Sequence, residues 1–209
     1  MRHLSHKRNR FIKVANDYSG LLSYEDGKNQ IIASSGVLNS IWNNWNNFWR
    51  EFWIAYVKGG YDFSQNRIAP IYPNYTDKQA CHYLLYLCGK RRRHNVGDSI
   101  TYNNQEATWG DPNIISSLAT GLVRHHSYMN YVLGVLNHYQ IPIMHLQKIR
   151  NTFIHLNSEN VNNLNTISSY YSFSPNQDLI DILDARDIGA NVRCFDNLVS
   201  NMKGMIINL

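Results

Sequence analysis

The sequence contains no apolar run that approaches the ~20 residues needed for a membrane-spanning helix. Its basic start, MRHLSHKRNRFIKV, also lacks the apolar segment of a secretory signal peptide. Cysteine is scarce, since Cys81, Cys88 and Cys194 make an odd number and form no C-x-x-C pair. A disulfide framework is therefore not expected, and a reducing compartment is favoured. We expect a cytoplasmic protein that makes no contact with a membrane.

Charged residues are few as well, at 17% of the 209 residues, and they leave a net charge of +5. This modest basic excess is compatible with a nucleic acid or another polyanion as partner, but it does not require one. Hydrophobic residues at 44% and aromatic residues at 12% are typical of a globular protein and exclude a disordered chain. The length suits one medium-sized domain, or one domain with an appended segment.

Neither alternating strands nor βαβ spacing occurs, whereas signals for helix starts and stops recur. A Trp-rich pattern predicts a long helix over residues 37–58, which Gly59-Gly60 ends. The two prolines of residues 60–75 predict a loop. Residues 76–79 (TDKQ) form a capping box, and Asp111-Pro112 supplies an N-cap followed by a favoured first residue. The predicted fold class is all-α.

The other segments carry weaker signals. Residues 1–35 are ambiguous, with a turn-like stretch at 25–30. Ile141-Pro142 predicts a break or kink before the next helix. Ser158 is a candidate start for a further turn of helix, and residues 174–177 (SPNQ) form another capping box ahead of the last two helices.

Residues 146–157, LQKIRNTFIHLN, combine an apolar stripe with an unusual polar group. The stripe consists of Leu146, Ile149, Phe153 and Leu156, and its spacing predicts one buried helix face. Beside it lie Arg150, Asn151 and His155. Asn151 and His155 are four residues apart and share a face, but Arg150 lies about 140° round the axis from His155. One helix therefore does not point Arg150 and His155 at a single atom, although a cleft between two copies of this helix can receive both.

The residue types in this group suit the cleavage of RNA by its own 2′-hydroxyl. An arginine offers a planar, permanently charged fork that binds a phosphate. A histidine offers a proton acceptor or donor near neutral pH. Together they supply a proton shuttle and a cation for the developing charge on the phosphorus, and this chemistry needs no metal.

The pattern R-N-x-x-x-H, formed by Arg150, Asn151 and His155 on a late helix of an all-α chain, resembles the motif of the HEPN superfamily. The Trp-rich helix ending in Gly-Gly, the WGDP at 109–112 and the helix containing Asn130 agree with this resemblance. It covers roughly residues 36–172. We therefore expect a HEPN-like helical bundle at 36–172, an N-terminal extension at 1–35 and C-terminal helices at 173–209 packed on the same domain.

The resemblance implies a homodimer with a composite active site and a metal-independent endoribonuclease without cofactor. Such enzymes act as toxins, in anti-phage defence or in RNA processing, and leave a 2′,3′-cyclic phosphate and a 5′-hydroxyl. His155 would then move the proton, Arg150 would hold the scissile phosphate, and Asn151 would orient either of them. An antitoxin or another regulatory protein is a possible partner. Where toxins paired with a nucleotidyltransferase often have a tyrosine, two residues after the histidine, this chain has Asn157.

Other basic residues are candidates for RNA binding. The densest cluster is KRRRH at 90–94, and Lys148 precedes the motif. The candidates are Lys90, Arg91, Arg92, Arg93, His94 and Lys148. The cluster has an equally good structural explanation, because cations near a helix C-terminus complement the helix dipole. The tryptophans Trp42, Trp45, Trp49 and Trp53 recur at helical spacing, which favours core or dimer packing over base stacking.

A metal site is not expected from the spacing of Cys81, His82, Cys88 and His94, which matches no zinc pattern and favours core packing. Two further functions stay open beside the ribonuclease. The chain can be a catalytically silent HEPN-like module that binds nucleotide or RNA, or that serves as a dimerisation platform. It can also be a plain structural helical domain in which the motif arose by chance.

Overall fold

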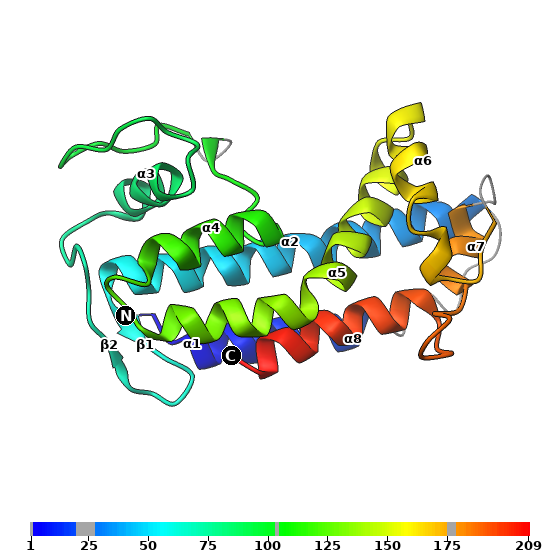
Figure 1. Ribbon diagram of the computed structural model, residues 1–209, viewed down its shortest axis with the longest axis horizontal. Helices are drawn as coiled ribbons and strands as arrows, with labels where there is room; N and C mark the ends of the chain where they lie inside the picture. The colour runs from blue at the N-terminus through cyan, green and yellow to red at the C-terminus, as the bar shows by residue number, and fades with distance from the viewer. Residues whose placement is uncertain (1, 20–27, 103–104, 175–178) are drawn as a thin grey trace. The chain divides into compact units, whose positions relative to one another are not determined.

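The structure, a computed structural model, describes residues 2–19, 28–102, 105–174 and 179–209 (Figure 1). Within them, α-helices predominate and the only β-sheet has two strands of two residues each. The predicted all-α class is therefore confirmed. Among the described residues, no helix has both the length and the apolar character that crossing a membrane requires.

The α-helices are α1 Leu4–Ser19, α2 Lys28–Lys58, α3 Asp77–Leu87, α4 Pro112–Leu122, α5 Tyr128–Ile154, α6 Ser158–Asn165, α7 Leu179–Asp184 and α8 Cys194–Ile207. A short 3₁₀ helix, η3, spans Ser168–Tyr170, and the strands are β1 Gly60–Tyr61 and β2 Arg67–Ile68. The chain divides into two compact units. Unit 1 comprises Met1–Phe11, Trp45–His138 and Ile207–Leu209, and unit 2 comprises Ile12–Asn44 and Tyr139–Ile206. The family-based limits at residues 36 and 172 stay a prediction.

Unit 1 is built on the aromatic part of α2. Trp45, Trp49 and Trp53 are fully buried, so the tryptophan stripe forms core, as its spacing predicted. Trp49 stacks on Trp53 with ring centroids 5.3 Å apart, and Trp45 meets Trp49 edge to face at 5.6 Å. Such pairs each add about 0.5–1.5 kcal/mol to the effect of burying the rings.

The WGDP segment closes this core against α2. The indole nitrogen of Trp45 donates to the carbonyl of Gly110 at 2.8 Å, and the amide of Gly110 donates to Oδ1 of Asn46 at 2.8 Å. A Cβ atom on Gly110 would lie 2.2 Å from Cδ1 of Trp45, so only glycine fits at this position. Asp111 then caps α4 through the amide of Asn113, and Pro112 is the first residue of the helix, as predicted.

The starts and stops of the helices in unit 1 follow the sequence signals with two differences. The capping box at 76–79 opens α3 with both reciprocal hydrogen bonds. Gly59, in the left-handed region with φ of 90°, ends α2 where predicted. However, α2 begins at Lys28, well before residue 37, and the predicted loop at 60–75 contains the short antiparallel pair β1–β2. Of the turn-like stretch 25–30, residues 28–30 are helical, and 25–27 lie outside the described residues.

Unit 2 contains the first part of α2, the second part of α5, and α6 to α8. A break or a kink was predicted at Pro142, and the break is wrong, because α5 continues from Tyr128 to Ile154 with this proline inside it. A proline within a helix removes one backbone hydrogen bond, a loss that packing on neighbouring residues can offset. Helix α6 begins at Ser158, with Asn157 as its cap. Residues 175–177 of the predicted capping box lie outside the described residues.

Candidate functional site

The motif residues lie at the end of α5 in unit 2. Leu146, Ile149 and Phe153 are buried, as the apolar stripe predicted. Leu156 is 69% exposed, however, because α5 ends at Ile154 and the chain leaves the helical path before this residue. The stripe therefore covers three residues and not four.

Arg150 is half-buried and lies between two asparagines. One terminal nitrogen of its guanidinium donates to Oδ1 of Asn39 on α2 at 2.7 Å, and the other donates to Oδ1 of Asn151 at 3.0 Å. Its Nε is buried and has no hydrogen-bond partner. No carboxylate among the described residues forms an ion pair with Arg150. Burial lowers its pKa, since the charged form loses water without gaining an opposite charge.

The surroundings of Arg150 make it a good candidate for anion binding. A guanidinium has five N–H groups in a planar fork, and the two amide oxygens engage only two of them. Amide oxygens orient the group without neutralising it, so its full positive charge remains for an incoming anion. A phosphate group is an anion whose oxygens can accept hydrogen bonds from such a fork.

His155 is the first residue after α5, and its side chain is exposed. Its backbone is held on both sides. The amide donates to the carbonyl of Asn151 at 2.8 Å, and Nδ2 of Asn160 donates to the carbonyl of His155 at 2.6 Å. The imidazole itself has no hydrogen-bond partner among the described residues. The geometry thus gives a fixed backbone that presents an exposed imidazole to solvent.

The side chains of Arg150 and Asn151 are hydrogen-bonded to each other. The side chain of His155 forms no hydrogen bond with either of them. Asn157, at the position of the tyrosine found in some toxins, has a structural role, because its side chain accepts from the amide of Asn160 and caps α6. Lys148 donates to the hydroxyl of Thr166 at 2.8 Å on the exposed surface. The motif site of a single copy therefore consists of an oriented cation and, separately, a free imidazole.

A second histidine of unit 2 lies in its core. His145 is buried, and its Nδ1 lies 2.9 Å from the hydroxyl of Tyr171. Its ring also packs edge to face on Tyr170, with centroids 4.7 Å apart. Burial lowers the pKa of His145 to about 4, so this imidazole is neutral and serves the packing of unit 2.

The basic segment 90–93 (KRRR) belongs to unit 1, where it follows the end of α3. Gly89 has φ of 74°, and its amide donates to the carbonyl of Tyr86 while that of Lys90 donates to the carbonyl of Leu85. These two bonds form a Schellman motif, which needs glycine at this point. The four basic side chains are exposed, and no carboxylate among the described residues pairs with them. They are available to a polyanion.

His94 does not share the environment of these four cations. It is half-buried, with Nε2 3.0 Å from the hydroxyl of Tyr75 and Nδ1 3.0 Å from Nδ1 of His82. Burial, with a contribution from His82, lowers the pKa of His94 below its ordinary value of 6.5. We predicted that His94 binds RNA together with residues 90–93. In the structure its ring contacts Tyr75 and His82, whereas the four side chains of 90–93 are exposed.

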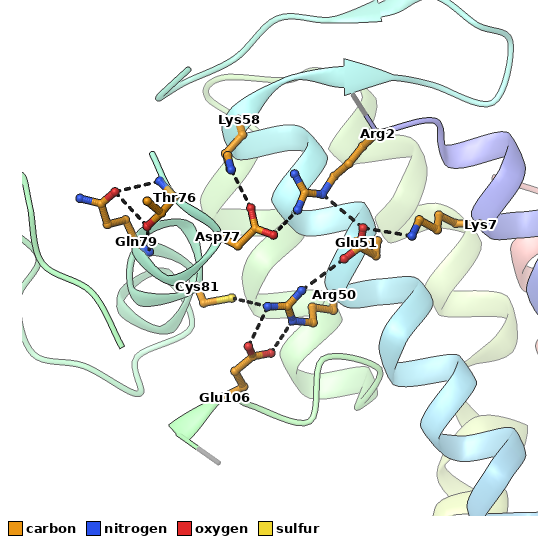
Figure 2. Close-up of polar contacts among 10 residues, drawn as sticks. All are labelled: Arg2, Lys7, Arg50, Glu51, Lys58, Thr76, Asp77, Gln79, Cys81 and Glu106. Carbon is orange, nitrogen blue, oxygen red and sulfur yellow. Dashed lines mark hydrogen bonds and ion pairs between the residues drawn. The ribbon is translucent and has the colours of Figure 1, made fainter. Parts of the chain in front are cut away.

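Several charged side chains of unit 1 form one ion-pair network (Figure 2). Arg50 of α2 binds Glu106 through two bonds, Nε to Oε2 at 2.7 Å and a terminal nitrogen to Oε1 at 2.9 Å. Glu51 accepts from Arg50 at 3.2 Å and from Arg2 at 3.2 Å, and Asp77 of α3 pairs with Arg2 and with Lys58.

This network is structural. Arg50 and Glu51 are mostly buried, with side chains 23% and 18% exposed. Nearby, burial raises the pKa of Cys81 to about 12, which favours a protonated, poorly nucleophilic thiol near neutral pH. Cys88 is similarly held as a neutral thiol, because burial raises its pKa too.

Sequence reasoning missed the residues that give Arg150, His82 and His94 their surroundings. Asn39 lies 111 positions before Arg150, and no local pattern marks it as a partner. Tyr75 lies 19 positions before His94, and no local pattern marks it as a partner. Asp98 comes to the two histidines through a local turn, which Gly97 does signal. Comparison of the chain with protein-family models, with curated proteins and with solved structures gave no match.

Proposed function

We propose that this protein is an endoribonuclease of the HEPN type that cleaves RNA through the RNA's own 2′-hydroxyl, as a toxin or a phage-defence effector. One observation carries the proposal. Arg150 is a half-buried guanidinium held by two amide oxygens and by no acid among the described residues, at the same helix end as the exposed His155. A cation that the fold orients without neutralising is suited to a phosphate ligand.

The proposed active unit is a homodimer. Within one copy, Arg150 lies on α5 and His155 follows its last residue, and positions five residues apart on helical geometry lie about 140° apart round the axis. Two copies that meet at these helix ends would supply two guanidinium groups and two imidazoles to one cleft. Cleavage of a phosphodiester needs both a base and an acid, which a pair of imidazoles provides.

The proposed reaction balances without any other reagent. One His155 takes the proton of the 2′-hydroxyl, the 2′-oxygen bonds to phosphorus, and the bond from phosphorus to the 5′-oxygen breaks. The imidazole of the second copy gives its proton to that leaving oxygen. Arg150 stabilises the charge that develops on the phosphorane oxygens, and Asn151 keeps the guanidinium oriented. The products are a 2′,3′-cyclic phosphate and a 5′-hydroxyl, and no metal ion takes part.

Lys148 and the segment 90–93 are the proposed contacts to the rest of the RNA. The exposed charges of 90–93, together with the half-buried Lys148, would give an affinity that falls as salt rises, because each neutralised phosphate releases a counterion. A protein that covers the exposed His155, or this basic segment, would act as an antitoxin or regulator.

A second candidate function is a silent module that binds nucleotide or RNA. It is favoured by the fact that Asn39 and Asn151 already orient Arg150 in one copy, while His155 makes no side-chain contact that aims it. Binding of a phosphate group needs only the oriented Arg150, whereas cleavage needs His155 as well.

The test is incubation of diverse RNAs with the purified protein in excess EDTA. We expect wild type to cut, leaving cyclic-phosphate ends, and we expect His155→Ala and Arg150→Ala to lose about 10²–10⁴-fold in rate. His125→Ala is the matched control for an exposed histidine, and Arg10→Ala is the control for an exposed arginine. Circular dichroism establishes that each variant is folded.

Three results would distinguish the candidates. Cutting that both site variants lose and both controls keep supports the ribonuclease. RNA that stays intact, but binds wild type more tightly than Arg150→Ala, supports the silent module. Equal cutting by all five proteins would contradict the proposed site altogether.

A further inference from the structure

Three side chains with metal-binding chemistry meet in unit 1, away from the motif. They are His82 on α3, His94 in the loop that follows, and Asp98 in the turn after that. One ligand atom of each lies within 4.8 Å of those of the other two. All three side chains are half-buried, so the cluster is neither a solvated surface group nor sealed core.

The local backbone is shaped to bring Asp98 to the histidines. Residues 95–98 (NVGD) form a turn in which the amide of Asp98 donates to the carbonyl of Asn95 at 3.1 Å, and Gly97 has φ of 98°. Glycine at this place is the requirement of a type II turn. Oδ2 of Asp98 accepts from the amide and from Nδ2 of Asn95, at 2.7 and 3.3 Å. These bonds fix the carboxylate and leave Oδ1 for another ligand.

His94 is oriented from its other side. Its Nε2 lies 3.0 Å from the hydroxyl of Tyr75. The hydroxyl oxygen can accept a hydrogen bond from Nε2–H of His94. In that tautomer the lone pair of His94 is on Nδ1, the nitrogen that faces His82. Metal-binding histidines are held in this way, with the second ring nitrogen donating to a neighbouring acceptor. Tyr83 and Tyr86 pack beside the ring and limit access of water.

The separation of the two ring nitrogens suits a bridging ion. Nδ1 of His82 and Nδ1 of His94 are 3.0 Å apart. Two nitrogens on a tetrahedral zinc ion at ~2.0–2.1 Å lie about 3.3–3.4 Å from each other, so only a small adjustment is needed. Two histidines and one carboxylate are a common ligand set for Zn²⁺ and related transition metals.

We propose that His82, His94 and Asp98 bind one divalent transition-metal ion of the zinc class, with a fourth position open to water. The ion would connect α3 to the loop and turn that follow it. In the sequence, the exposed segment 90–93 lies between two of the proposed ligands, His82 and His94. The main effect of the ion would be to hold this basic segment in one conformation. The proposal does not depend on the proposed ribonuclease function, whose catalytic residues Arg150, Asn151 and His155 lie in unit 2, although the segment 90–93 is also a proposed contact to RNA.

The test uses the full chain, freed of metal with EDTA and dialysed, and titrated with Zn²⁺ by calorimetry and with Co²⁺ by visible absorption. We expect one equivalent to bind, with the intense Co²⁺ absorption of a four-coordinate site. His82→Gln and Asp98→Asn should each bind at least about 100-fold more weakly, and Tyr75→Phe about 10–100-fold more weakly. Asp98→Asn keeps an acceptor for Asn95, so the turn survives. His125→Gln is the control and should bind like wild type.

Trypsin supplies a readout that does not depend on affinity, because residues 90–93 are four consecutive cleavage sites. Zn²⁺ should slow cutting there in wild type and in His125→Gln, and it should not do so in His82→Gln or Asp98→Asn. Wild-type binding no tighter than that of His82→Gln would overturn the proposal. So would cleavage at 90–93 that is indifferent to Zn²⁺. In either case His82 and His94 form only a hydrogen-bonded pair.

Discussion

Two half-buried arginines of this protein have opposite surroundings. Arg50, in unit 1, forms a paired contact with Glu106 and a further bond to Glu51, and these acids raise its pKa above the ordinary value despite burial. Arg150, in unit 2, contacts two amide oxygens and has one buried nitrogen without a partner. Burial alone then lowers its pKa.

The difference separates a structural charge from one that is ready to bind. A buried ion pair with its hydrogen bonds satisfied contributes to holding its elements together, and it has no charge left to offer. A guanidinium held by neutral oxygens keeps its charge, and the free energy lost on desolvation is recovered when an anion arrives. Composition and exposure alone would rank Arg50 and Arg150 as equals; only their partners distinguish them.

The largest expected effect comes from removing the acid partner of Arg50. Glu106→Gln keeps the size of the side chain and an oxygen for the indole of Trp109, but it takes away the charge that faces Arg50. Because the Glu106 side chain is only 11% exposed, we expect a loss of about 2–4 kcal/mol in the free energy of unfolding. Urea unfolding followed by circular dichroism measures it. A loss no larger than that of an exposed control, Glu159→Gln, would contradict the structural role.

Acid should have a smaller effect of the same origin. Burial alone would raise the pKa of Glu106, but hydrogen bonds from Arg50 and Trp109 outweigh it and hold the pKa below its ordinary value of 4.5. The stabilisation is therefore complete above about pH 4.5 and is lost as pH falls through the lower value of the folded state. Urea unfolding at a series of pH values should show that the free energy of unfolding of wild type falls below pH 4.5. In Glu106→Gln it should fall less steeply. Parallel declines would show that other acids dominate.

Signals that act over a few residues predicted much of the fold. The capping box at 76–79, the Asp111-Pro112 start and the glycine stop at Gly59 depend on hydrogen bonds between near neighbours, which the sequence displays directly. The tryptophan stripe was equally visible, because four large rings at helical spacing have few places other than core. The apolar stripe of α5 was predicted for the same reason.

What could not be predicted depends on partners far along the chain. The continuation of α5 through Pro142 overrides a strong local preference, and packing decides such cases. The motif itself specified Arg150, but its distinctive feature is Asn39, which α2 brings from 111 positions away. Asp98 is a different case, because it is only four residues from His94. The spacing of His82 and His94 matched no zinc pattern, and the turn at 95–98 brings the carboxylate of Asp98 to them.

The comparison of the two arginines is tested most directly by giving Arg150 the kind of partner that Arg50 has. Asn39→Asp places a carboxylate 2.7 Å from its guanidinium with almost no change in shape. Because the pair is only partly buried, we expect a gain of at most about 0.5–1 kcal/mol in stability. We also expect the affinity for a short RNA, and any cleavage of it, to fall at least about tenfold, since the charge is now neutralised internally. Asn39→Ala is the matched variant, because it removes the support without adding a charge. If Asn39→Asp binds RNA as tightly as wild type, the free charge of Arg150 is not what binds phosphate, and the distinction between the two arginines has no functional meaning.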